Sequence, residues 1–95
     1  MKNKLLQIIN HYGINNQLRK FNEKNFELIE AIHGNYYDTE DVLYCGNDDN
    51  IKEEIADNLV LLSQFILYFG IDLDEIEKIF NKKVNRQIER IKDEQ

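Results

Sequence analysis

The chain contains no proline and only four glycines among its 95 residues, and this scarcity of helix-breaking residues limits its fold more than any other feature. Proline and glycine are the residues that interrupt helices most strongly. Apolar residues recur at intervals of three and four along most of the chain, which is the period of an amphipathic helix. The sequence therefore predicts an all-α protein, and we expect a four-helix bundle.

The glycines and the apolar periods together predict where the helices lie. The first helix spans about residues 3–12 and ends at Gly13, and the second spans about residues 16–33 and ends at Gly34. The third begins near residue 50 with a capping box and ends at Gly70, and the fourth begins at Asp72 with a similar cap. The segment between Gly34 and residue 49 is expected to be an ordered loop.

The last two predicted helices are expected to carry the core. The third is apolar almost all the way round from Leu59 onward, which is typical of a helix buried on several sides. The fourth presents one apolar stripe, expected to face the core, that consists of Ile76, Ile79, Phe80, Val84, Ile88 and Ile91. A small monomer cannot easily bury this much apolar surface. We therefore expect a homodimer or a homotetramer.

Length and charge exclude several classes of protein. Ninety-five residues predict one domain, residues 1–95. The formal net charge of −6 argues against a general nucleic-acid-binding surface. Cys45 stands alone, so the chain has neither an internal disulfide nor a cysteine zinc site, and a reducing cytoplasmic location is expected. We expect no signal peptide and no membrane span, because the longest apolar stretch is too short.

Two pairs of carboxylates are the first candidate site. Glu27 and Glu30 lie three residues apart in the second predicted helix, and Glu54 and Asp57 have the same spacing in the third. This spacing places both members of a pair on one helical face, and two such faces can surround a hard cation such as Mg²⁺. Either pair alone is more often a solvated helix surface.

A basic stripe on the fourth predicted helix is the second candidate. Lys82, Arg86 and Arg90 follow one another at intervals of four residues, with Lys83 beside them. If these cations share a cavity with the carboxylates, the site suits a polyphosphate. Ion pairs with neighbouring glutamates on a solvated face would account for the stripe equally well.

These segments resemble the MazG-like family of all-α nucleoside triphosphate pyrophosphohydrolases, especially its small single-domain members. The family pattern is E-E-x-x-E, a spacer, and then E-x-x-D. Residues 17–32 resemble the first half, residues 53–57 the second, and residues 68–86 the closing helix with its Lys and Arg. The resemblance covers most of the chain.

The resemblance implies hydrolysis of a nucleoside triphosphate to the monophosphate and pyrophosphate with Mg²⁺, or alternatively Mn²⁺, as the cofactor. It implies that Glu27, Glu54 and Asp57 bind the metal, together with Glu30. Glu23 and Glu54 are the candidate catalytic residues, with Glu53 as a further candidate for the general base. The phosphates are expected to contact Lys83 and Arg86.

Lys24 departs from the family pattern. If Glu27 fills the last acidic position of E-E-x-x-E, Glu23 fills the first and Lys24 replaces the second. An alternative register takes Glu27 and Glu30 as the ligand pair. The departure also supports an alternative function, in which the protein binds a nucleotide or a protein partner without turnover. A helical adaptor is the third hypothesis.

Overall fold

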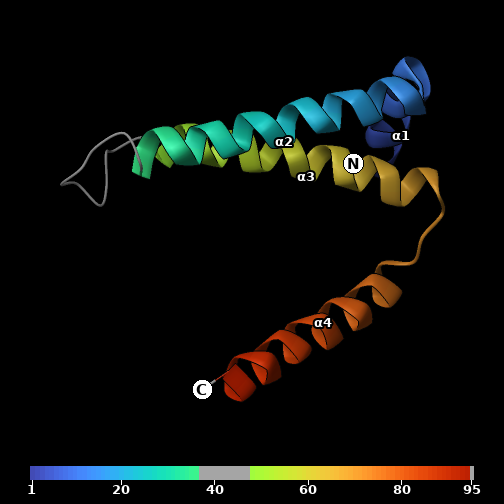
Figure 1. Ribbon diagram of the computed structural model, residues 1–95. Helices are drawn as coiled ribbons and strands as arrows, with labels where there is room; N and C mark the ends of the chain where they lie inside the picture. The colour runs from blue at the N-terminus through green and yellow to red at the C-terminus, as the bar shows by residue number, and fades with distance from the viewer. Residues whose placement is uncertain (37–47, 95) are drawn as a thin grey trace.

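The computed structural model describes residues 1–36 and 48–94, which are helical almost throughout. In chain order the helices are α1 (Lys2–Tyr12), α2 (Ile14–Tyr36), α3 (Asp48–Tyr68) and α4 (Leu73–Glu94) (Figure 1). These two ranges contain four helices and no strand, so the prediction of an all-α chain with four helices is confirmed for them. The described helices also include none that is long and apolar enough to cross a membrane.

Gly13 forms the corner between α1 and α2. Its φ of 88° and ψ of 152° are open to glycine but not to residues with a side chain. The Gly13 amide donates to the carbonyl of Ile9 at 2.8 Å, and the side-chain amide of Asn16 donates to the carbonyl of Tyr12 at 2.7 Å. The predicted end of the first helix at Gly13 is confirmed.

The corner between α3 and α4 is held by a Schellman motif. Gly70 has a φ of 64°, its amide donates to Leu67, and the Ile71 amide donates to Ile66 at 3.0 Å. Asp72 then caps α4, because its Oδ1 accepts the amide of Asp74 at 3.0 Å. Both predicted boundaries here are confirmed.

The end of the second helix was predicted wrongly. Gly34 does not stop α2, which continues to Tyr36, and α3 begins at Asp48 rather than near residue 50. A glycine inside a helix costs only about 1 kcal/mol, so without a positive φ it need not end the helix. Most of the expected loop, residues 37–47, lies outside the described residues.

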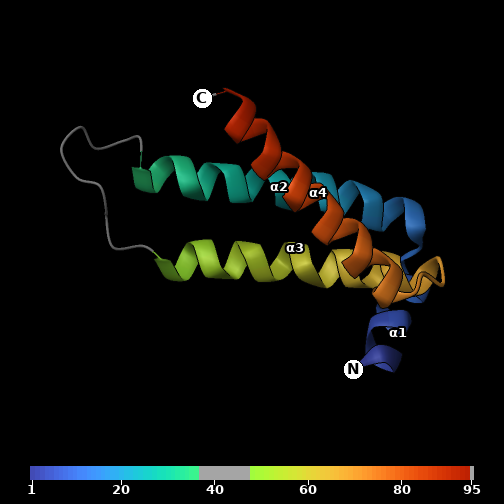
Figure 2. The same cartoon turned by 90° about the horizontal axis from the view of Figure 1, so that it is seen from below.

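α2 and α3 run antiparallel, side by side, and α1 packs against the end of this pair (Figures 1 and 2). Among the side chains that the structure describes, the buried apolar residues of α1, α2 and α3 are Ile9, Ala31 and Leu61. Phe21 and Phe65 meet edge to face between α2 and α3, with ring centroids 5.5 Å apart. This small core orients the polar side chains that α2 and α3 direct toward each other.

α4 stands apart from the other three helices, and here the structure contradicts the expectation of a core face within the chain. Every described residue of α4 is exposed except Ile76, which is half-buried. Phe80, in the middle of the expected core stripe, is 63% exposed. The apolar faces of α3 are also open, with Leu59 and Leu62 both exposed. Periodicity correctly identified the apolar stripes, but the chain does not cover them itself.

Candidate functional site

Lys24 lies at the centre of the acidic cluster between α2 and α3. Its Nζ is 3.0 Å from Oε2 of Glu27 on the same helix and 3.4 Å from Oδ2 of Asp57 on α3. The two carboxylates keep the pKa of Lys24 above its ordinary value, mainly through the hydrogen bond that Lys24 donates to Glu27. The substituted position of the family pattern thus contributes a cation to the site that the carboxylates were expected to form.

Glu54 is the carboxylate of the cluster that has a buried, unpaired oxygen. Its Oε2 is buried and has no hydrogen-bond partner. Burial, followed by the nearby charge of Glu27, raises the pKa of Glu54. Glu27 responds in the opposite direction, because the hydrogen bond from Lys24 lowers its pKa. The pKa values of the neighbouring Glu27 and Glu54 carboxyl groups therefore move apart, as expected for two like charges that share a site.

Asn58 ties the two helices together beside this cluster. Its side-chain amide donates to the carbonyl of Lys24 at 3.1 Å and to the carbonyl of Glu54 at 2.8 Å. Its Oδ1 is buried without a partner. The bond to Lys24 crosses from α3 to α2 and helps to fix the register of the two helices beside the cluster, whereas the bond to Glu54 lies within α3.

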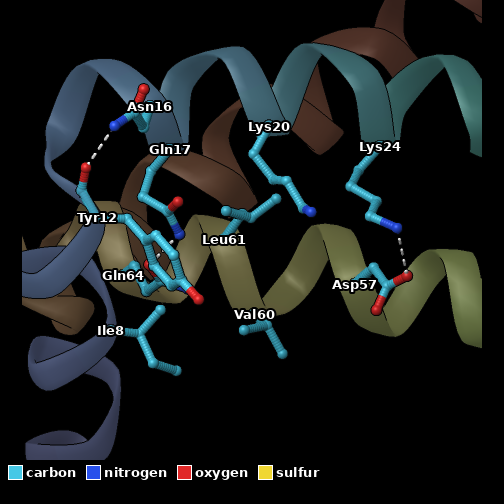
Figure 3. Close-up of a pocket in the computed structure, with 10 residues that line it drawn as sticks. All are labelled: Ile8, Tyr12, Asn16, Gln17, Lys20, Lys24, Asp57, Val60, Leu61 and Gln64. Carbon is cyan, nitrogen blue, oxygen red and sulfur yellow. Dashed lines mark hydrogen bonds and ion pairs between the residues drawn. The ribbon is translucent and has the colours of Figure 1, made fainter.

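The structure brings some of the predicted site residues together and separates others. Glu27, Glu54 and Asp57 meet around Lys24, whereas Glu23 and Glu30 are exposed on α2. Glu53 is exposed on α3. The two predicted phosphate ligands, Lys83 and Arg86, lie on α4, whose ribbon passes behind α2 and α3 when the cluster is viewed from its open side (Figure 3).

A cavity of about 440 Å³ extends from the cluster toward α1. It lies between α1, α2 and α3 and is lined by Ile8, Tyr12, Asn16, Gln17, Lys20, Lys24, Asp57, Val60, Leu61 and Gln64 (Figure 3). The sequence reasoning did not assign Lys20, Gln17 or Gln64 to a site. A signal was present in the sequence, because Gln64 interrupts the most apolar stretch of the chain.

The donor set of the cluster suits a hard cation, since carboxylate oxygens are the ligands that Mg²⁺ prefers and one of them is buried without a partner. Among the described residues, however, no three acidic, histidine or cysteine side chains are arranged to hold a metal ion. Glu27, Glu54 and Asp57 would hold Mg²⁺ only after the Lys24 ammonium has moved from between Glu27 and Asp57.

No protein-family model, curated protein or solved structure matches the chain. The similarity to MazG-like enzymes therefore rests on the motifs alone.

Proposed function

We propose that the chain is a MazG-like nucleoside triphosphate pyrophosphohydrolase that uses Mg²⁺. One observation carries the proposal: three carboxylates from two helices, Glu27, Glu54 and Asp57, surround one cation between α2 and α3. One oxygen of the cluster, Oε2 of Glu54, is buried without a partner, and a buried carboxylate costs free energy unless a cation or a hydrogen-bond donor pairs with it. The cavity beside it is of the size at which proteins bind small molecules.

The side chains have separate roles in this proposal. Glu27 and Asp57 already hold a cation and would hold the metal, and Asn58 keeps α2 and α3 in register around it. Glu54 is better placed than Glu23 to take a proton, because it lies in the cluster while Glu23 is exposed. When bound, Mg²⁺ supplies charge neutralisation at the phosphates.

The test is pyrophosphate release from a panel of ribo- and deoxyribonucleoside triphosphates, with Mg²⁺, with Mn²⁺ and with EDTA. We expect metal-dependent release that the Asp57→Asn variant reduces by about 100-fold or more, since even residues behind a metal ligand contribute about 10- to 100-fold. Circular dichroism checks that the variant is folded. Full activity of Asp57→Asn would refute the assignment of the metal site.

A second function, nucleotide binding without turnover, is favoured by a specific contact. The 3.0 Å ion pair between Lys24 and Glu27 neutralises a carboxylate that the enzyme needs for its metal. Under this hypothesis the protein binds nucleoside triphosphates in EDTA and in Mg²⁺ alike and releases no pyrophosphate. The same panel, with binding measured by calorimetry, separates the two functions.

The proposal includes a homodimer or homotetramer. The chain exposes 7973 Å², whereas a compact monomer of its mass, 11.4 kDa, exposes about 5,800 Å². Its radius of gyration is 17.0 Å, against about 12 Å for a compact domain of this length. The excess of about 2,200 Å² per chain is within the range that an obligate dimer buries.

A further inference from the structure

The far end of the cavity contains a buried pair of amide side chains. The side-chain amide of Gln17 on α2 donates to Oε1 of Gln64 on α3 at 2.9 Å. Gln64 is only 1% exposed and Gln17 only 7%. A pair of apolar residues would hold two helices together at least as well, because buried polar groups offset their own desolvation and little more. The pair thus gives little extra stability, but both of its amides line the cavity and can offer polar groups to a ligand there.

The polar residues follow a fixed order along the cavity. α2 lines the cavity with one amide and two cations, Gln17, Lys20 and Lys24, and Glu27 follows three residues beyond this lining. The helix rises by about 15 Å over the ten steps from Gln17 to Glu27. Antiparallel α3 places Gln64 opposite the amide and Asp57 opposite the second cation. The cavity thus passes from neutral amides through cations to carboxylates.

This order matches the order of groups in a nucleoside triphosphate. Ile8, Tyr12, Val60 and Leu61 supply apolar and aromatic walls near the amide end, where a flat base fits (Figure 3). An amide has both donors and an acceptor and can bind the polar edge of a base. Lys20 extends from α2 toward the cavity, and its charge reaches Glu27, whose pKa it helps to lower. Phosphates between the two ends would meet Lys20 and Lys24.

We propose that the α1–α2–α3 cavity is the nucleotide subsite of this protein, with Gln17 and Gln64 at the base and Lys20 at the phosphates. The inference rests on the proposed function for its ligand class, a nucleoside triphosphate. It replaces Lys83 and Arg86, which lie on the separate helix α4, as the phosphate contacts. Lys24, held by Glu27 and Asp57 in the ligand-free protein, moves to the phosphates when the nucleotide binds.

The first test measures affinity by titration calorimetry in EDTA, with ATP, GTP, CTP, UTP and inorganic triphosphate as probes. Lys20→Gln is expected to weaken the binding of all five probes by about tenfold, as the loss of a charge-assisted phosphate contact does. Lys83→Gln and Lys4→Gln remove a charge from α4 and from exposed α1, and they are the matched controls. Loss of affinity in Lys83→Gln but not in Lys20→Gln would overturn the proposal.

The second test addresses the base. The double variant Gln17→Leu/Gln64→Leu replaces the amide pair by apolar side chains of similar size, and we expect it to stay folded. Its affinity for inorganic triphosphate should be unchanged, while the ratio of affinities among the four nucleotides approaches one. An unchanged ratio would refute the role of the amides. Because inorganic triphosphate has no base, its affinity shows whether the double variant has lost only base recognition or the whole binding cavity.

These outcomes distinguish the subsite from the enzyme. Nucleotide binding in EDTA that depends on Lys20, without pyrophosphate release in Mg²⁺, would support the subsite and refute the hydrolase. Pyrophosphate release that is insensitive to Lys20→Gln and to the double variant would refute the subsite and leave the hydrolase standing. A folded wild-type protein that binds none of the five probes in EDTA would overturn the subsite as proposed.

Discussion

Lys24 is the residue that most alters the chemistry of the acidic cluster. Its ammonium group lies between two carboxylates, 3.0 Å from Glu27 and 3.4 Å from Asp57, so it serves as their counter-ion. An ammonium group is compact, strongly hydrated and attached to a flexible chain. It can therefore hold the carboxylates together in the absence of a ligand. It can also move away when Mg²⁺ binds the carboxylates together with a nucleoside triphosphate.

We expect Lys24→Glu to raise the affinity for Mg²⁺, because it removes a competing cation and adds two ligand oxygens. Lys24→Met keeps the length of the side chain and removes only its charge, so its affinity should lie between those of the wild type and Lys24→Glu. Calorimetric titration with MgCl₂ gives both values. Equal or weaker binding by Lys24→Glu would show that its side chain does not face the metal.

The raised pKa of Glu54 predicts that the stability of the protein depends on pH. Its pKa is raised in the folded protein, mainly by burial, so the folded chain binds this proton more tightly than the unfolded chain does. The free energy of unfolding therefore falls as pH rises from the ordinary glutamate pKa of 4.5 through the raised value. The contribution of this group is favourable below that window and is lost above it.

Glu54→Gln should accordingly raise the Tm at neutral pH and remove the decrease in stability with rising pH. It should also abolish any hydrolysis of nucleoside triphosphates. Glu53→Gln removes the same charge from an exposed neighbour on the same helix and should leave the Tm nearly unchanged. Thermal unfolding followed by circular dichroism between pH 4 and pH 8 compares the three proteins. A lower Tm for Glu54→Gln than for Glu53→Gln would contradict the assignment.

At the scale of the helices, the α3–α4 corner determines where α4 points. The Schellman bonds from Gly70 and Ile71 end α3, and two residues later Asp72 caps α4. Because both sides of this short connection are fixed by local hydrogen bonds, α4 leaves at a defined angle instead of folding back on α3. Its apolar stripe is therefore left almost uncovered by the three-helix body.

Gly70→Ala should destabilise the protein by about 1 kcal/mol or more, because a side chain raises the free energy of a backbone with positive φ. The cause is conformational and not steric, since no atom lies within 4 Å of the position that a Cβ would take. Gly70→Asn should lose less stability than Gly70→Ala, because asparagine tolerates this conformation. Chemical denaturation measures both, and equal stability of Gly70→Ala and the wild type would contradict the role of this corner.

At the scale of the whole molecule, the exposed apolar surface is the dominant feature. Most of the stability of a helix in a protein comes from the packing of its apolar face, and the stripe of α4 contacts little of its own chain. This stripe consists of Ile76, Ile79, Phe80, Val84, Ile88 and Ile91. α3 exposes a second stripe that consists of Ile55, Leu59, Leu62 and Phe69. A second copy of the chain would cover both.

Val84→Glu places a charge in the α4 stripe, where Val84 is 45% exposed in the single chain. We expect this change to weaken self-association by about 100-fold or more, because burying an unpaired charge costs several kcal/mol. Asn85→Glu adds the same charge at the neighbouring position, outside the stripe, and should leave association unchanged. Sedimentation equilibrium compares the variants. A wild type that is monomeric at every concentration would refute the oligomer.

By itself, the sequence determined the helices and the residues that end or cap them. These depend on local properties, namely the apolar period, the positive φ of Gly13 and Gly70 and the cap at Asp72. Their spacing also singled out Glu27, Glu30, Glu54 and Asp57, and all of these but Glu30 meet around Lys24. Gly34 shows the limit of this reasoning, because a glycine without a positive φ leaves no local signal that decides where a helix ends.

Only the tertiary structure decided which side chains of one helix lie opposite which side chains of another. It placed Lys24 between Glu27 and Asp57, paired Gln17 with Gln64 and put Lys83 and Arg86 on α4, a helix with few contacts to the other three. These relations depend on the register of α2 against α3 and on the direction in which α4 leaves its corner. Helical periodicity specifies which residues share a face, but it contains no information on the distance between two helices far apart in the chain.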